Sequence, residues 1–174
     1  MKKACYGLAT LLLAASPLGV HAADAPFVAN PNATLIYFDA AANATFDPLE
    51  PQSNSSVGQA ALMAAYDSLV KLTDAGEPIP GLAKSWKYNA DLTEFTLSLR
   101  PGVLFHDGTP CDAEAVKFNI ERGKTDAGSN VKPELTSVKA VRAESPTRVV
   151  LELTQPDTAL PLILSDRAGM MVSP

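Results

Sequence analysis

Five side chains able to do chemistry lie within nine positions of one another. They are His106, Asp107, Cys111, Asp112 and Glu114. Such a group could hold a metal ion, and Cys111 beside His106 could act as a nucleophile and its base. The spacing matches no standard metal-ligand set, however, and no acid lies at a spacing known to orient the histidine. The pattern therefore favours turn and helix-cap roles, with no metal, no cofactor and no catalysis. A secreted hydrolase that uses Cys111 and His106 is kept as a remote alternative.

The first 22 residues have the pattern of a cleavable export signal. Two lysines follow the initiator methionine, an uncharged apolar run comes next, and small residues occupy the expected cleavage positions. This order predicts a signal peptide over 1–22, cleaved between Ala22 and Ala23, and an exported protein that does not span a membrane afterwards. Cleavage also removes Cys5, so Cys111 is left without a partner for an intramolecular disulfide.

The composition is that of an acidic globular protein. The chain has 174 residues, of which 47% are hydrophobic and 19% charged, with a net charge of -5. Loss of the signal peptide takes away two lysines and no acid, which makes the net charge -7. We therefore expect no nucleic-acid partner. The length suits a single ordinary domain.

Local patterns predict short strands and helices in alternation. The predicted strands are 34–38, a hairpin of 86–88 with 94–100, a hairpin of 137–144 with 148–154, and a strand that starts at 170–172. The predicted helices are 57–72, 113–122 with Asp112 as its N-cap, and 160–164. Segments 39–56 and 78–81 are expected to be irregular because proline, asparagine and serine punctuate them.

Several of these segments occur together in a known family. Their sequences are YDSLV (66–70), PGLAKSW (80–86), FTLSLRPGVLFHDGTP (95–110) and AEAVKFN (113–119). In this order they resemble the dipeptide-, oligopeptide- and nickel-binding class of ABC-importer solute-binding proteins, solute-binding protein family 5. The resemblance implies an α/β fold of the periplasmic-binding-protein type II-like class, with mixed sheets and flanking helices.

The same resemblance implies how the chain is divided. After the signal peptide, 23–45 would be a leader and the first strand of lobe I. Residues 46–165 would form a small α/β subdomain, and 166–174 would return to lobe I. Members of the family are several times longer, so we expect a truncated chain with apolar surface exposed at 34–38 and 170–172.

The function implied by the resemblance is solute capture. The protein would bind peptides or similar small solutes in the periplasm and deliver them to an inner-membrane ABC permease, without catalysis. The alternatives are a sensing or ligand-presenting module that does not transport, and a truncated remnant without function. The residues do not indicate which solute is bound.

Two segments are candidates for ligand contact. Ligands of open α/β sheets bind beyond the carboxyl ends of the strands, and the loop after predicted strand 34–38 lies at such an end. Its candidate residues are Asp39, Ala40, Ala41, Ala42 and Asn43. The second segment precedes the return to lobe I, where Arg167 could pair with a peptide carboxylate and Met170 lies close by in sequence. The resemblance places the main ligand-selecting residues beyond 174.

Overall fold

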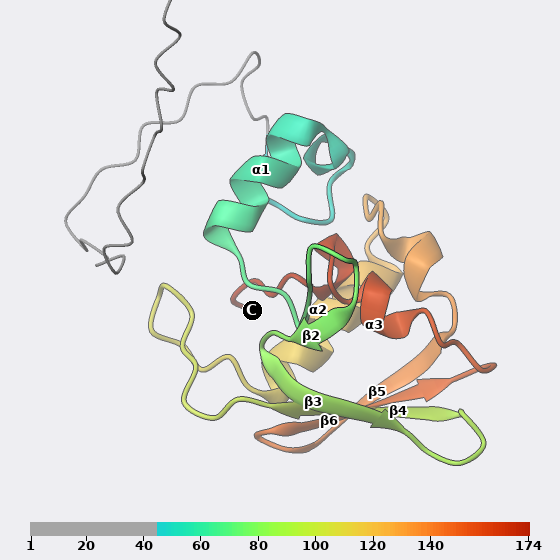
Figure 1. Cartoon of the computed structure of the whole chain (residues 1–174). Coiled ribbons are helices and arrows are strands. Elements are labelled where there is room, and N and C mark those ends of the chain that lie inside the picture. The colour runs from blue at the N-terminus through green and yellow to red at the C-terminus, as the bar shows by residue number, and fades with distance from the viewer. Residues whose placement is uncertain (1–44) are drawn as a thin grey trace, which may run out of the picture. The chain divides into compact units, whose positions relative to one another are not determined.

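A four-stranded antiparallel sheet is the base of the described structure, a computed structural model that describes residues 45–174 (Figure 1). Its strands lie in the order β3-β4-β6-β5. Their bounds are β3 Ala83–Tyr88, β4 Glu94–Leu99, β5 Val138–Ser145 and β6 Arg148–Leu153. The two predicted hairpins are confirmed, since β3 pairs with β4 and β5 with β6 in antiparallel fashion.

One face of this sheet is the apolar core. Phe95 of β4 lies opposite Leu151 of β6, and Leu97 lies opposite Val149. All four side chains are inaccessible to solvent. Alternation along each strand places these residues on one face, as the sequence predicts. Burial of each such side chain contributes about 1.5–3 kcal/mol to stability.

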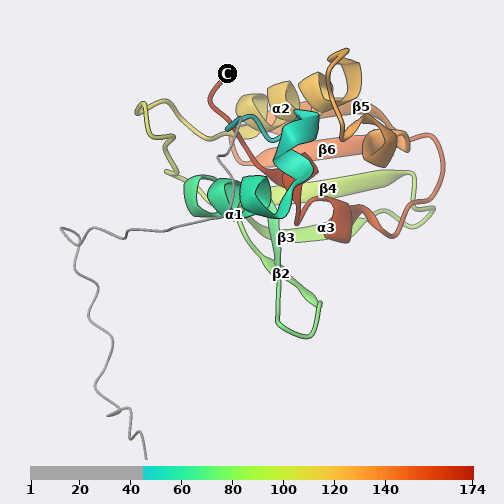
Figure 2. The same cartoon turned by 90° about the horizontal axis from the view of Figure 1, so that it is seen from above.

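Helix α2, Ala113–Thr125, packs against β5 and β6 (Figure 2). Its N-cap is Asp112, as predicted, and the Asp112 carboxylate accepts hydrogen bonds from the N–H groups of Glu114 and Ala115. The buried face of the helix presents Val116 and Ile120 to the sheet. The helix continues three residues beyond the predicted end.

The first helix is shorter than the sequence predicts. Helix α1 covers Ser56–Ala65 and begins at the N-cap Ser55, whose side chain accepts from Gly58 N–H. The predicted helix 57–72 is wrong beyond Ala65 because Tyr66 has extended backbone geometry. The chain then forms β1, Val70–Leu72.

Strand β1 pairs with a strand rich in proline. This strand, β2, covers Pro78–Pro80, where the sequence predicts irregular structure. The N–H of Thr73 donates to the carbonyl of Glu77, so hydrogen-bonded pairs alternate from there along the ladder. Pro78 and Pro80 fall at the intervening pairs, where no N–H is directed at β1. Proline is therefore compatible with β2.

Short helical turns complete the described part. They are η1 Pro51–Asn54, η2 Lys132–Leu135, α3 Leu160–Ile163 and η3 Arg167–Gly169. Helix α3 confirms the helix predicted at 160–164. The strand predicted to start at 170–172 is reduced to one isolated bridge between Ser68 and Met170. Within the described residues, no helix has the length and apolar character needed to cross a bilayer.

Candidate functional site

The predicted ligand-contact loop after the first strand lies outside the described residues. This holds for Asp39, Ala40, Ala41, Ala42 and Asn43, as well as for strand 34–38 and the signal peptide. The structure therefore leaves this loop as a prediction, and the described chain begins two residues after it, at Thr45.

Arg167 is a buried side chain that contacts protein groups. Only 4% of its surface is exposed. Its Nη1 donates to Ser53 Oγ at 3.2 Å and to the carbonyl of Pro48 at 3.4 Å. Its nearest carboxylate in the described part is Glu134, at 3.9 Å from Nη2. In this arrangement a ligand carboxylate could reach Arg167 only after segment 48–53 had moved.

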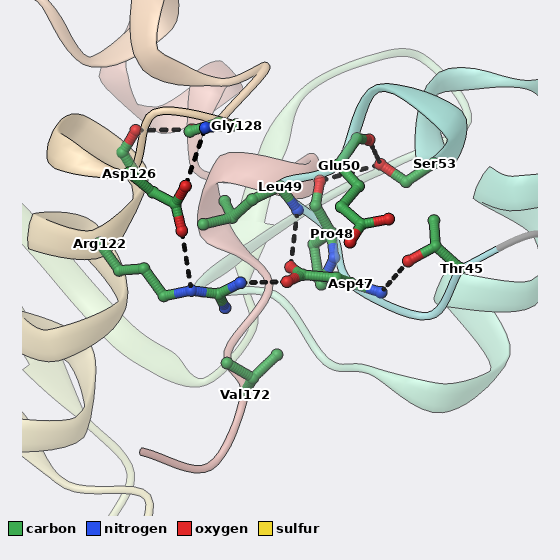
Figure 3. Close-up of polar contacts among 12 residues, drawn as sticks. Thr45, Asp47, Pro48, Leu49, Glu50, Ser53, Arg122, Asp126, Gly128 and Val172 are labelled. Atoms are coloured by element: carbon green, nitrogen blue, oxygen red, sulfur yellow. Dashed lines mark hydrogen bonds and ion pairs between the residues drawn. The ribbon is translucent and has the colours of Figure 1, made fainter.

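Segment 47–53 is also bound by a second arginine (Figure 3). Arg122 of α2 forms an ion pair with Asp47, and its Nε lies 3.9 Å from Asp126. Asp47 in turn accepts from the N–H of Leu49 at 3.0 Å. Arg122 and Arg167 thus hold from two sides the segment that follows the predicted ligand-contact loop in sequence.

Met170 begins the exit segment, which we define as Met170–Ser173. Met170 and Met171 are 7% and 3% exposed, so the apolar surface expected at 170–172 is largely covered. Asn119 of α2 fixes the next residue. Its side-chain amide donates to the carbonyl of Val172 at 2.8 Å and accepts from the N–H of Val172 at 3.0 Å. Asn119 therefore bonds the exit segment as a neighbouring strand would.

The other side of the exit segment is bound by a loop. Asp107 accepts from Ser173 Oγ at 2.6 Å, and its second oxygen accepts from the N–H and hydroxyl of Thr109. These hydrogen bonds lower the pKa of the exposed Asp107 carboxyl to about 2, with that of Ser173 as the largest cause. The carboxylate is therefore charged at any physiological pH.

A cavity of about 550 Å³ lies between this loop and the exit segment. It brings together residues from four stretches of sequence, namely Ala65, Tyr66, Asp67, Leu82, Val103, Leu104, Phe105, His106, Asp107, Cys111, Met171, Val172 and Ser173. Three of the five residues singled out by their chemistry line it, and Asp112 and Glu114 do not. The sequence alone gave no sign that Tyr66, Asp67 and the exit segment would join them.

The cavity does not favour nucleophilic chemistry at Cys111. Burial raises the pKa of its thiol to about 11, and the charges of Asp112 and Asp67 add to the effect. A cysteine nucleophile needs the opposite shift, because the thiolate is the reactive form. Within residues 45–174, no cluster of three or more histidine, cysteine or acidic side chains is arranged to hold a metal ion.

Buried Asn119 is a structural residue that the sequence analysis missed. It is 8% exposed within a helix whose buried neighbours are apolar, such as Val116 and Ile120. An amide at a core-facing position of a helix is the signal that could have identified it, because buried polar groups require partners.

Comparisons with known proteins agree on one family. The family model described as "Bacterial extracellular solute-binding proteins, family 5 Middle" matches residues 77–173. The glutathione-binding protein GsiB of Escherichia coli K12 is 32% identical over 136 residues, which are 77% of this chain and 27% of GsiB. The chain thus spans about a quarter of the length of these relatives.

Solved structures give the same result. AgaA from A. tumefaciens R10, a PBP in complex with agropinic acid, is 28% identical with a TM-score of 0.69 over 75% of this chain and 26% of AgaA. NikZ from Campylobacter jejuni, in complex with Ni(L-His), is 29% identical with a TM-score of 0.64 over 73% of this chain and 25% of NikZ. The described residues therefore form part of a type II periplasmic-binding-protein fold. Since the family model covers more than half of its residues, the chain belongs to the family 5 bacterial extracellular solute-binding proteins.

Proposed function

We propose that this chain is part of the substrate-binding component of an ABC importer. It would capture peptides or similar small solutes in the periplasm and deliver them to an inner-membrane permease. The match of the family model over 77–173 carries this proposal. Capture would be non-covalent, with two lobes closing over the solute and the closed form docking to the permease.

The solutes named for the relatives support a small polar solute for this protein, but they differ from one relative to the next. By their names and titles, GsiB binds glutathione, and the structures of AgaA and NikZ contain agropinic acid and Ni(L-His). OppA of Haemophilus influenzae, whose structure contains the peptide RPPGFSPFR, is 18% identical and shares the fold. We therefore propose a peptide or an amino-acid-derived solute for this protein.

The proposed contacts lie at the junction of the small subdomain and lobe I. We propose that Asp39, Ala40, Ala41, Ala42 and Asn43 contact the solute. Met170 would take part where the chain returns to lobe I, and Arg167 would do so only after segment 48–53 had moved. Segment 47–53, which follows loop 39–43 in the sequence, is bonded by Arg122 and Arg167.

The experiment that tests the function uses the native protein from a periplasmic extract. Its intact mass and N-terminus are measured first, and its melting temperature is then followed with dipeptides, oligopeptides, glutathione, nickel–histidine and sugars. We expect an N-terminus at Ala23 and a melting temperature raised by one solute class. A solute at a hundred times its Kd adds about 2.7 kcal/mol to the stability of the folded protein.

A contrary result is equally clear. If the native mass equals that of residues 23–174 and no solute raises the melting temperature, the transport proposal is wrong. A sensing module or a remnant would then describe the chain better. The matched control is the same panel measured on another exported protein of the extract, which must not respond.

A further inference from the structure

We propose that the cavity between loop 103–111 and the exit segment binds a small organic cation, a primary ammonium group carried on an apolar body. This goes beyond the transport role, because none of the cavity's described lining residues is among the proposed solute contacts. Its volume of about 550 Å³ is within the usual range for small-molecule sites.

The apolar body of the ligand would pack against the aliphatic and aromatic side chains of the cavity wall. Leu82, Val103 and Phe105 are partly exposed and pack against the core, and Met171 is 3% exposed. Side chains of this kind bind ligands by removing apolar surface from water. The wall is continuous with the core, which limits its movement.

The polar part of the lining carries negative charge. Asp67 and Asp107 line the cavity, whereas no lysine or arginine is among its lining residues in the described part of the chain. Asp67 forms an ion pair with Lys71 at 2.8 Å. Asp107 is bonded only by neutral donors, two from Thr109 and one from Ser173, so its charge is not neutralised. A carboxylate offers about four acceptor positions, which leaves one for an ammonium group.

Carboxylates also act on two other lining groups, Tyr66 and Cys111. The pKa of the Cys111 thiol is raised by burial first and by the charges of Asp112 and Asp67 second. The pKa of Tyr66 is raised by burial and then by Asp47, against a smaller opposite effect of Arg122. The carboxylates that contribute to both shifts disfavour an added negative charge, whereas burial, the larger cause, disfavours a charge of either sign.

Hydrogen bonds hold the cavity wall in place. Asn119 bonds both backbone groups of Val172, and Asp107 accepts a hydrogen bond from Ser173 Oγ. A site held in this way loses little conformational entropy on binding. The carboxylate of Asp107 thus has a fixed position relative to the apolar wall.

Titration calorimetry of the exported chain, residues 23–174, tests the proposal with three probes of similar shape. The probes are phenethylamine, phenethyl alcohol and hydrocinnamate. We expect the amine to bind about two- to fivefold more tightly than the alcohol, because Asp107 is exposed and an exposed ion pair contributes modestly. The carboxylate probe should bind most weakly.

Two matched pairs of variants locate the site. Asp107→Asn should reduce amine affinity about two- to fivefold and leave alcohol affinity unchanged. Asp74→Asn, an equal change of charge outside the lining, should alter neither. Ala65→Phe fills the cavity at the end of α1 and should abolish binding of every probe. Its control is Ala64→Phe, on the exposed neighbouring residue. Equal affinity for the three probes, no binding of the amine, or amine binding retained in Ala65→Phe would each overturn the proposal.

Discussion

At the scale of single residues, burial decides how much an arginine contributes to the stability of the fold. Arg142 forms ion pairs with three glutamates, but its side chain is 44% exposed. In the described part, no carboxylate oxygen lies closer than 3.9 Å to the Arg167 guanidinium. The Arg167 side chain is nevertheless only 4% exposed. Its Nε has no hydrogen-bond partner among the described residues. Exposed ion pairs contribute little, whereas removal of a buried charged partner leaves other polar groups unsatisfied.

We therefore predict that Arg167→Ala is much more destabilising than Arg142→Ala. The first substitution leaves a cavity and removes the donor to Ser53 Oγ and the carbonyl of Pro48, at a cost of about 2–4 kcal/mol. Urea unfolding followed by the fluorescence of Trp86, the single tryptophan, measures both variants. Equal midpoints for the two variants would show that Arg167 has no structural role.

At the scale of elements, the exit segment depends on close backbone contact. The N–H of Leu69 donates to the carbonyl of Gly169, and the N–H of Val70 donates to the carbonyl of Leu164. A Cβ atom at position 169 would collide with the backbone of Leu164. Glycine at this position thus lets η3 lie against the end of α3. Carbonyl groups of both elements then accept hydrogen bonds from Leu69 and Val70, where β1 begins.

Gly169→Ala should accordingly cost about 2 kcal/mol or more, because the backbone of Leu164 cannot yield as a flexible side chain could. Gly128→Ala is the matched control, since its added Cβ would meet only Asp126 Oδ1 at an ordinary 3.5 Å. The free energy of unfolding of both variants gives the answer. A Gly169→Ala protein as stable as Gly128→Ala would contradict the packing described.

The elements also show how far the sequence predicts this fold. The hairpins and Asp112 were predicted because turn residues, alternation and caps are local signals. The helical spacing of Ala61, Ala65 and Leu69 predicts a helix over 57–72, which is longer than the observed α1. The backbone groups of Leu69 and Val70 instead bond residues nearly a hundred positions away. No local pattern contains such a contact.

The same limit applies to the site. The sequence places His106, Asp107 and Cys111 close together, and the structure places all three at one cavity. It could not show that Met171–Ser173 closes the other side. Nor could it show that Arg167, a candidate partner for a ligand carboxylate, bonds Ser53 and Pro48. Both facts arise from tertiary packing between segments far apart in the chain.

At the scale of the whole molecule, residues 45–174 have a core of their own. Buried apolar side chains extend from β4 and β6 through α2 to Leu160, Leu164 and Met171. Large exposed apolar residues such as Phe46, Met63 and Leu104 occur on separate segments. This arrangement does not support the strong surface exposure expected from sequence at the exit segment.

We therefore predict that the exported chain unfolds in one cooperative transition and binds little hydrophobic dye before it. The contiguous core is the physical reason, because a single packed cluster unfolds as a unit. Thermal unfolding monitored by Trp86 fluorescence and by dye fluorescence should give the same midpoint. Strong dye binding at low temperature, or two separate midpoints, would show that the core does not hold without more of the chain.

The prolines of β2 have a consequence for self-association. Because Pro78 and Pro80 occupy pairs whose N–H groups would face away from β1, the outer edge of β2 lacks two donors that another strand would need. In the sheets of the described residues β2 is an edge strand, with β1 as its partner. Unpaired strand edges can pair with the edges of neighbouring copies. Two alternating prolines make this edge a poor template for aggregation and remove no ladder bond to β1.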